Sequence, residues 1–236
     1  MNNIKLPILQ DFVNGAKDIY HEGLISVILY GSAASGEFSA LHSNINLALI
    51  LSDTSLSNLS KIAPLLKKSK FRLLKTIFFT EGYILTSADV FPVEFLDMKE
   101  NHKILYGRDL LSNLQIDVRN LRFQCEQELK SKIINIKRAY LDHIDSPNLD
   151  RMLMKFFTSS LHILRNVLRL KSGRAIYRKE EILNEAAGEF NIDISTMKKI
   201  LDAKLANKRL PGKQASGLFI SFVDILEKIS GVVDSL

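Results

Sequence analysis

Two short apolar runs with a small-residue loop between them restrict the fold of this chain more than any other feature. The runs are Ile25 to Tyr30 and Ile45 to Leu51, and both consist mainly of β-branched and large aliphatic residues. Apolar runs of this length, bounded by turn-forming residues, are typical of buried strands. The loop between them begins at Gly31 and is rich in Gly, Ser and Ala. We therefore expect two adjacent buried strands joined through this loop.

The rest of the first half alternates between helical and strand-like patterns. An amphipathic helix is expected from Leu6 to Glu22, because apolar residues recur there every three or four positions. A second helix is expected from Ser57 to Ser69, with Pro64 kinking it or displacing its start. The remaining predictions are a third strand at Leu73 to Phe79, a turn or short helix at Thr80 to Ala88, a fourth strand at Phe91 to Met98, and a strand or helix end at Lys103 to Leu105 that turns through Gly107.

The second half has a different architecture, because strand signals stop near Leu110 and helical periodicity continues to the end. Helices are predicted at about Asn120 to His143, Leu149 to Lys171, Arg178 to Phe190, Ser195 to Lys204 and Ala215 to Val233. Such a series is typical of an antiparallel bundle of four or five helices. The chain is therefore expected to be α+β, with a mixed sheet and flanking helices in residues 1–110 and an all-α bundle in residues 111–236.

The loop and the strand after it carry a recognisable pattern. The segment Leu29-Tyr30-Gly31-Ser32-Ala33-Ala34-Ser35-Gly36-Glu37-Phe38 is followed by Ser43-Asn44-Ile45-Asn46-Leu47. This pattern resembles the signature of the DNA polymerase beta-like nucleotidyltransferase superfamily, in which a strand enters a Gly-Ser turn and the next strand begins with Ser-Asp-x-Asp. The helices of the second half are similar to the bundle of kanamycin-type nucleotidyltransferases. The resemblance implies a nucleotidyltransferase fold, and a dimer of the kanamycin type is one possible assembly.

Gly31 and Ser32 are the predicted phosphate-binding residues of this pattern. A glycine lets the backbone approach a triphosphate closely, and a serine offers it a hydroxyl and an amide. A helix that begins directly after the turn would favour negative charge. An unrelated α/β domain with a Gly/Ser turn is the alternative interpretation, in which the asparagines before the second strand are ordinary turn residues.

The metal-binding part of the pattern is altered at Asn44 and Asn46. Residues two apart on a strand point the same way, so aspartates at these positions would converge on two magnesium ions. An amide oxygen can bind a metal ion but brings no charge, so magnesium affinity should fall severely. The resemblance implies a third carboxylate on a later strand, for which Glu94 is the candidate and Asp97, on the opposite face, the alternative. Glu94 is therefore the candidate catalytic residue, with Asp97 as the alternative.

Composition excludes several other classes of protein. No apolar run reaches the roughly 18 residues that a membrane-spanning helix needs, and the N-terminal residues lack the pattern of a secretory signal, so a cytoplasmic location is expected. The single cysteine, Cys125, cannot form an intramolecular disulfide and is expected to pack in the core. The net charge of +6 comes mainly from the second half, where it is spread between helical apolar positions as on a solvated surface.

The leading hypothesis is a nucleotidyltransferase fold that has lost magnesium-dependent transfer and now binds a nucleotide or a protein partner, or has a regulatory role. The second is an active enzyme that uses Glu94 or Asp97, with magnesium and a nucleoside triphosphate, to modify a small hydroxylated acceptor or a protein. The third is a nucleic-acid-binding protein that uses the basic helices. It ranks last because no aromatic platform accompanies the positive charge.

Overall fold

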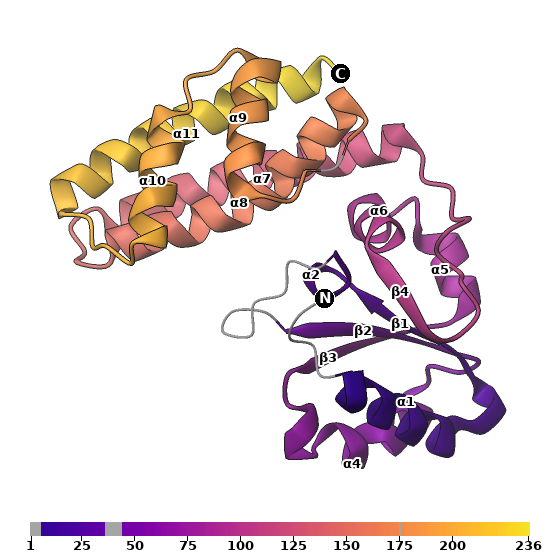
Figure 1. Cartoon of the computed structure of the whole chain (residues 1–236). Helices are drawn as coiled ribbons and strands as arrows, with labels where there is room; N and C mark the ends of the chain where they lie inside the picture. The colour runs from indigo at the N-terminus through magenta and orange to yellow at the C-terminus, as the bar shows by residue number, and fades with distance from the viewer. Residues whose placement is uncertain (1–5, 36–43, 175) are drawn as a thin grey trace. The chain divides into compact units, whose positions relative to one another are not determined.

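The computed structural model describes residues 6–35, 44–174 and 176–236 (Figure 1). The chain divides into two compact units, of which the first ends at Asp117 and the second begins at Val118. The boundary expected after residue 110 lies in the connection between the last strand of the first unit and the first helix of the second. No described helix is long and apolar enough to cross a membrane.

A four-stranded mixed sheet forms the centre of the first unit, with the strand order β3-β2-β1-β4. Strand β1 pairs antiparallel with both β2 and β4, and β2 pairs parallel with β3. The strands are β1 (Leu24–Tyr30), β2 (Ile45–Leu51), β3 (Leu74–Phe79) and β4 (His102–Gly107). The predictions of two adjacent buried strands and of a third strand at Leu73 to Phe79 are therefore confirmed.

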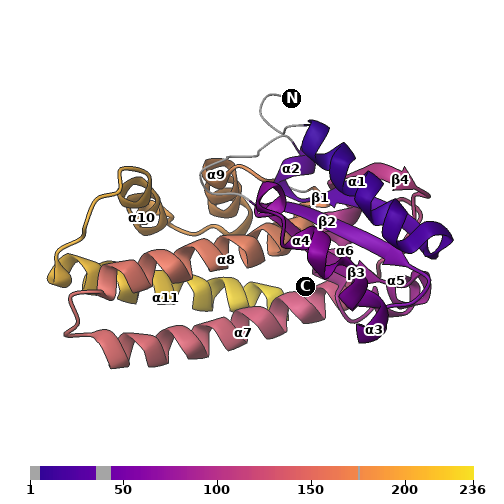
Figure 2. The same cartoon turned by 90° about the horizontal axis from the view of Figure 1, so that it is seen from below.

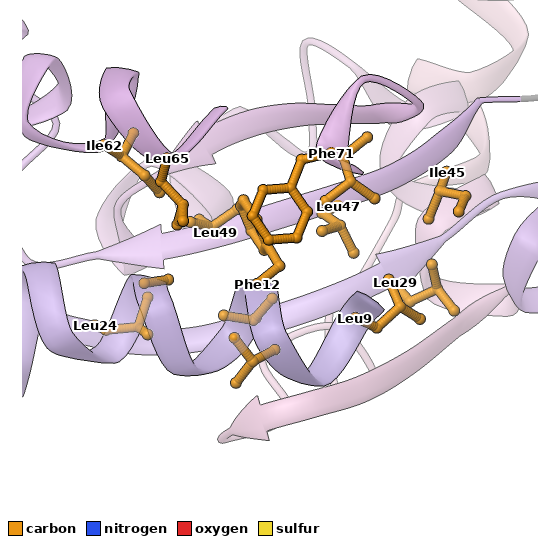
Figure 3. Close-up of a cluster of buried hydrophobic side chains, with 14 of the residues drawn as sticks. Leu9, Phe12, Leu24, Leu29, Ile45, Leu47, Leu49, Ile62, Leu65 and Phe71 are labelled. Carbon is orange, nitrogen blue, oxygen red and sulfur yellow. The ribbon is translucent and has the colours of Figure 1, made fainter. Parts of the chain in front are cut away.

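One face of the sheet packs against helix α1 (Leu6–Tyr20) and the short helix α4 (Ala63–Leu66) (Figure 1). Alternate residues of β2, including Leu47 and Leu49, point into this core because side chains on a strand alternate between faces. The rings of Phe12 and Phe71 meet edge to face in it, with centroids 5.3 Å apart (Figure 3). This cluster anchors α1, whose apolar residues were predicted from their helical spacing.

The opposite face packs against helix α5 (Glu81–Ser87) and helix α6 (Pro92–Glu100) (Figure 1). The other alternate residues of the two central strands, Ile28, Ala48 and Ile50, lie in this second core. The Phe95 ring of α6 lies 5.7 Å from the ring of Phe79 on β3, measured between centroids. The central strands are thus buried on both faces, which explains why their sequences are almost continuously apolar.

The predicted strand at Phe91 to Met98 is wrong, because residues 92–100 form helix α6. Pro92 starts this helix, where the missing N–H of proline costs no hydrogen bond. The alternation of apolar and polar residues after Pro92 suggested a strand. Phe95 and Met98 lie in the second core and are three positions apart, as on one helix face. The fourth strand is β4, in the segment for which a strand or a helix end was expected.

Short pieces replace the single helix expected at Ser57 to Ser69. They are α3 (Leu56–Leu59), η2 (Ser60–Ile62), α4 and η3 (Ser69–Phe71), where η denotes a 3-10 turn. Pro64 lies at the start of α4, where it interrupts the series of backbone hydrogen bonds that one continuous helix would need. The first helix, expected to end at Glu22, ends at Tyr20, and the 3-10 turn η1 (His21–Gly23) leads into β1.

Strands β1 and β4 meet at an irregularity that depends on Gly107. The pairing shifts register between Val27 and Ile28, and Ser26 is paired with Gly107. Gly107 has a φ of +80°, and a Cβ added to it would lie 2.0 Å from the carbonyl oxygen of Ile25. Such a contact with backbone cannot be relieved by a side-chain rotation. This position therefore requires glycine.

Helices make up the described part of the second unit (Figure 2). They are α7 (Val118–His143), α8 (Leu149–Ser172), α9 (Lys179–Phe190), α10 (Ser195–Leu205) and α11 (Gly212–Asp234). Helix α8 contacts all four of the others and has the most extensive buried face. Cys125 is buried on α7, so the expectation that it packs in the core is confirmed. The predicted helices agree with these bounds within a few residues, because each is amphipathic and is closed by turn residues.

Candidate functional site

Gly31 forms a tight turn directly after β1. Its φ is +73°, a left-handed conformation that glycine adopts without steric cost. The Gly31 N–H donates to the carbonyl oxygen of Asn101 at 3.1 Å, and the Gly31 carbonyl accepts from the N–H of Ala34 at 2.8 Å. The one-turn helix α2 (Ser32–Ser35) follows at once. The predicted phosphate-binding residues Gly31 and Ser32 thus lie at a turn that is hydrogen-bonded to the residue after α6. Residues 36–43, which form the rest of the motif loop, lie outside the described residues.

The side chain of Asn46 lies over this turn. A Cβ built on Gly31 would be 3.2 Å from the Nδ2 atom of Asn46, so the absence of a side chain at residue 31 makes room for the amide. Asn46 is the second residue of β2 and is partly buried, whereas Asn44 precedes the strand and is exposed. The structure therefore brings two of the predicted site features, the glycine turn and the altered metal position, into direct proximity.

Strand pairing extends this site into a row of polar side chains across the sheet. Asn46 is paired with Lys75 on β3 and with Tyr30 on β1, and Tyr30 is paired with His102 on β4. Paired residues point to the same face of a sheet. That face is the one toward α5 and α6, because the next residues on the same side, such as Ile28 and Ala48, belong to the second core. We call Lys75, Asn46, Tyr30 and His102 the polar row.

The members of the polar row differ in exposure. Lys75 is exposed, and the other three side chains are partly buried. Burial raises the pKa of the Tyr30 hydroxyl, so this group stays protonated at neutral pH. The Nδ1 atom of His102 lies 3.0 Å from the carbonyl oxygen of Lys99, and its Nε2 atom lies 3.2 Å from a carboxylate oxygen of Asp109. No strand position in the row holds a carboxylate.

Glu94 and Asp97 lie on helix α6 and not on a strand beside β2. Glu94 is exposed and Asp97 is partly buried. Glu94 was expected to supply the third carboxylate because residues 91–98 were predicted to be a strand. These residues form a helix, so that reason no longer applies. A catalytic role for either residue stays a prediction. The relevant observation is that Asn101, just after α6, is bound to the Gly31 turn.

The donor set around Gly31 does not fit a pair of magnesium ions. Magnesium prefers carboxylate oxygens and water in octahedral geometry, and two divalent ions need negative charge nearby. The polar row and Asn44 offer amides, a hydroxyl, an imidazole and an ammonium group. Across the described part of the chain, no group of three His, Cys, Asp or Glu side chains could hold a metal ion.

Asp109 contacts His102 at the end of the polar row. The low pKa of the Asp109 carboxyl predicts that the stability of the first unit depends on pH. Burial alone would raise this pKa, but hydrogen bonds from the side chain and N–H of Ser112, the N–H of Leu111 and His102 lower it well below its usual range. A carboxyl with a depressed folded-state pKa contributes stability above its unfolded pKa of about 3.9 and loses that contribution as the pH falls. We expect urea unfolding of the first unit to show a midpoint that falls between about pH 5 and pH 2. Asp109→Asn should show a clearly smaller fall, and an equal fall would contradict the assignment.

Several basic side chains of the second unit form ion pairs. Lys130 contacts Glu126 and Asp234, at 2.7 and 2.9 Å. Further pairs join Lys137 to Glu227, Arg174 to Glu185 and Arg178 to Glu181. Cations that are paired with carboxylates attract nucleic-acid phosphates less strongly than free ones. Nucleic-acid binding by the basic helices stays a prediction.

Comparison with known proteins gives a likeness among solved structures. No protein-family model and no curated protein matches the sequence. Among solved structures, the chain is similar to the spectinomycin adenyltransferase from Enterococcus faecialis, crystallised with ATP and spectinomycin. The two are 16% identical, the match covers 92% of this chain and 98% of that chain, and the TM-score is 0.58.

At this identity the likeness shows the fold alone, and it spans nearly all of both chains. It agrees with the arrangement described above, which is a mixed sheet flanked by helices and followed by a helical part. The chain therefore has a nucleotidyltransferase-type fold with a helical C-terminal part.

Proposed function

We propose that this protein binds a nucleoside triphosphate at the Gly31 turn and has lost magnesium-dependent nucleotidyl transfer. The observation that carries the proposal is the polar row, in which Asn46 lies against Gly31 and Lys75 stands beside Asn46. In this proposal the Gly31 turn accepts the phosphates. The paired strand positions beside it carry no carboxylate that would hold two divalent ions. Nucleotide binding would then serve regulation or the recognition of a protein partner, including a second copy of this chain.

Isothermal titration with ATP, GTP, CTP and UTP tests the binding part of this proposal. ATP is the first ligand to try, because the similar adenyltransferase was crystallised with it. We expect binding of at least one nucleotide and a loss of roughly tenfold in affinity for Gly31→Val, because a β-branched side chain is strained at positive φ and would displace the Asn46 amide. Absence of heat with all four nucleotides would contradict nucleotide binding and leave a partner-binding role.

A second candidate function is an active nucleotidyltransferase that uses a carboxylate of α6. It is favoured by the hydrogen bond between Gly31 and Asn101, which ties the end of α6 to the turn. Asn44 and Asn46 would then act as neutral ligands to one magnesium ion bridged by the nucleotide. The acceptor would be a small hydroxylated molecule or a protein.

A transfer assay with nucleotide labelled in the α-phosphate separates the two candidates. The degenerate protein should incorporate no label into aminoglycosides, spectinomycin or protein. Incorporation that is lost in Glu94→Ala or Asp97→Ala, and kept in Glu100→Ala on the same helix, would overturn the proposal and establish the active enzyme.

A further inference from the structure

Lys75 occupies the strand position next to Asn46, as the parallel register of β2 and β3 shows. The pairs Ile45–Leu74 and Asn46–Lys75 follow each other along these strands. Ile45 and Leu74 both belong to the core on the α1 face, so Asn46 and Lys75 point to the opposite face. Neighbouring strands lie about 4.8 Å apart. An ammonium group therefore stands beside the amide at the position where the fold's metal-binding residues would lie.

We propose that the Lys75 ammonium group takes the place of a divalent cation and binds the nucleotide phosphates directly. The inference rests on the proposed function, because it concerns the same nucleotide. It goes further in assigning the phosphate contact to a residue and in making binding independent of any metal ion.

The charges of the polar row support this assignment. A row of carboxylates repels phosphate unless metal ions lie between them, so carboxylates and metal are needed together. Here Asn44 and Asn46 are neutral, and Lys75 adds a positive charge that would repel a magnesium ion. Within the described part of the chain, Lys75 has no hydrogen bond or ion pair with a carboxylate to neutralise it.

The row is also a set of hydrogen-bond donors. The ammonium of Lys75, the amide NH2 of Asn46 and the hydroxyl of Tyr30 lie at matching positions on three neighbouring strands. Phosphate oxygens accept hydrogen bonds from all three kinds of donor. The direct ligand of this row is therefore an anionic phosphate group and not a metal ion.

The sheet provides a matched control at Lys103. Like Lys75, it is an exposed lysine on an edge strand of the same sheet. Lys103 is paired with Leu29, which belongs to the core on the α1 face, so it points away from the polar row. A change of charge at Lys103 alters the net charge equally and leaves the row intact.

The test is isothermal titration of the full chain with ATP in EDTA and, separately, in excess magnesium. We expect the wild type to bind ATP in EDTA at least as tightly as in magnesium. Lys75→Glu should bind about tenfold to hundredfold more weakly in EDTA, whereas Lys75→Arg and Lys103→Glu should stay within about threefold of the wild type. Circular dichroism of each variant checks that it is folded.

Other outcomes of this titration separate the two proposals. Binding by the wild type only in magnesium would overturn the role of Lys75 and leave nucleotide binding in place. Equal affinity of Lys75→Glu and the wild type in EDTA would also overturn that role. Absence of ATP binding in both buffers, together with absence of binding by the other three nucleotides, would overturn both.

Discussion

Replacing Gly107 by alanine is expected to lower the free energy of unfolding of the first unit by about 3 kcal/mol or more. Left-handed backbone costs a residue with a Cβ about 1–2 kcal/mol. The added carbon would also lie 2.0 Å from the carbonyl oxygen and 2.9 Å from the carbonyl carbon of Ile25. Both atoms belong to the backbone of β1, so the clash can be relieved only by opening the pairing of β1 with β4. Urea unfolding followed by circular dichroism measures the change.

Gly82→Ala is the control in the same unit. The nearest atom to a Cβ at Gly82 is the Thr80 hydroxyl oxygen at 4.0 Å, and Gly82 lies in helix α5. Alanine is favoured over glycine in a helix, so the stability should be unchanged or raised by up to about 1 kcal/mol. If the free energy of unfolding of Gly107→Ala lay within about 1 kcal/mol of the wild-type value, residue 107 would not have the close backbone contact with Ile25 described above.

Placing carboxylates at residues 44, 46 and 75 should create a magnesium site. The combined change Asn44→Asp, Asn46→Asp and Lys75→Glu replaces two neutral amides and one cation with three anions, two at the paired positions 46 and 75 and one at residue 44, just before β2. We expect isothermal titration with magnesium chloride to show binding at least tenfold tighter than in the wild type. The double change at the asparagines alone should give a smaller gain, because Lys75 still repels the ion.

The control for this prediction is the same pair of asparagine changes combined with Lys103→Glu, which adds its carboxylate on the other face of the sheet. Its magnesium affinity should match that of the double variant. If the triple variant bound magnesium no better than this control, the side chain of residue 75 would not lie beside those of residues 44 and 46. Thermal unfolding of each variant without magnesium would show the cost of placing like charges side by side.

Local sequence patterns were sufficient for most of the fold. The strands at β1, β2 and β3 and the five helices of the second unit follow from apolar periodicity and turn residues, which act within about ten positions along the chain. Helix α6 was missed because a short run with apolar residues at both two- and three-residue spacing fits either structure. Its identity is decided by contact with the sheet, through Phe95 and Met98.

The site was harder to predict than the fold. Gly31, Ser32, Asn44 and Asn46 lie in one segment, so a resemblance could identify them. Lys75 could not be found in this way, because its place beside Asn46 depends on the register between two parallel strands. Register is set by the packing of Leu47 and Leu74 against α1 and the residues after it, and no local pattern reports it.

The alternation of side chains along β2 determines how easily this fold can change the chemistry near Gly31. Leu47 and Leu49 point into one core and Ala48 and Ile50 into the other, whereas Asn46 lies at the edge of the second. A substitution at residue 46 or 75 therefore changes the charge near Gly31 while removing almost no buried apolar contact. The charge of such a row can change one residue at a time while the side chains of both cores stay the same. One scaffold can therefore carry either a metal-binding or a phosphate-binding set of side chains, as the proposed function requires.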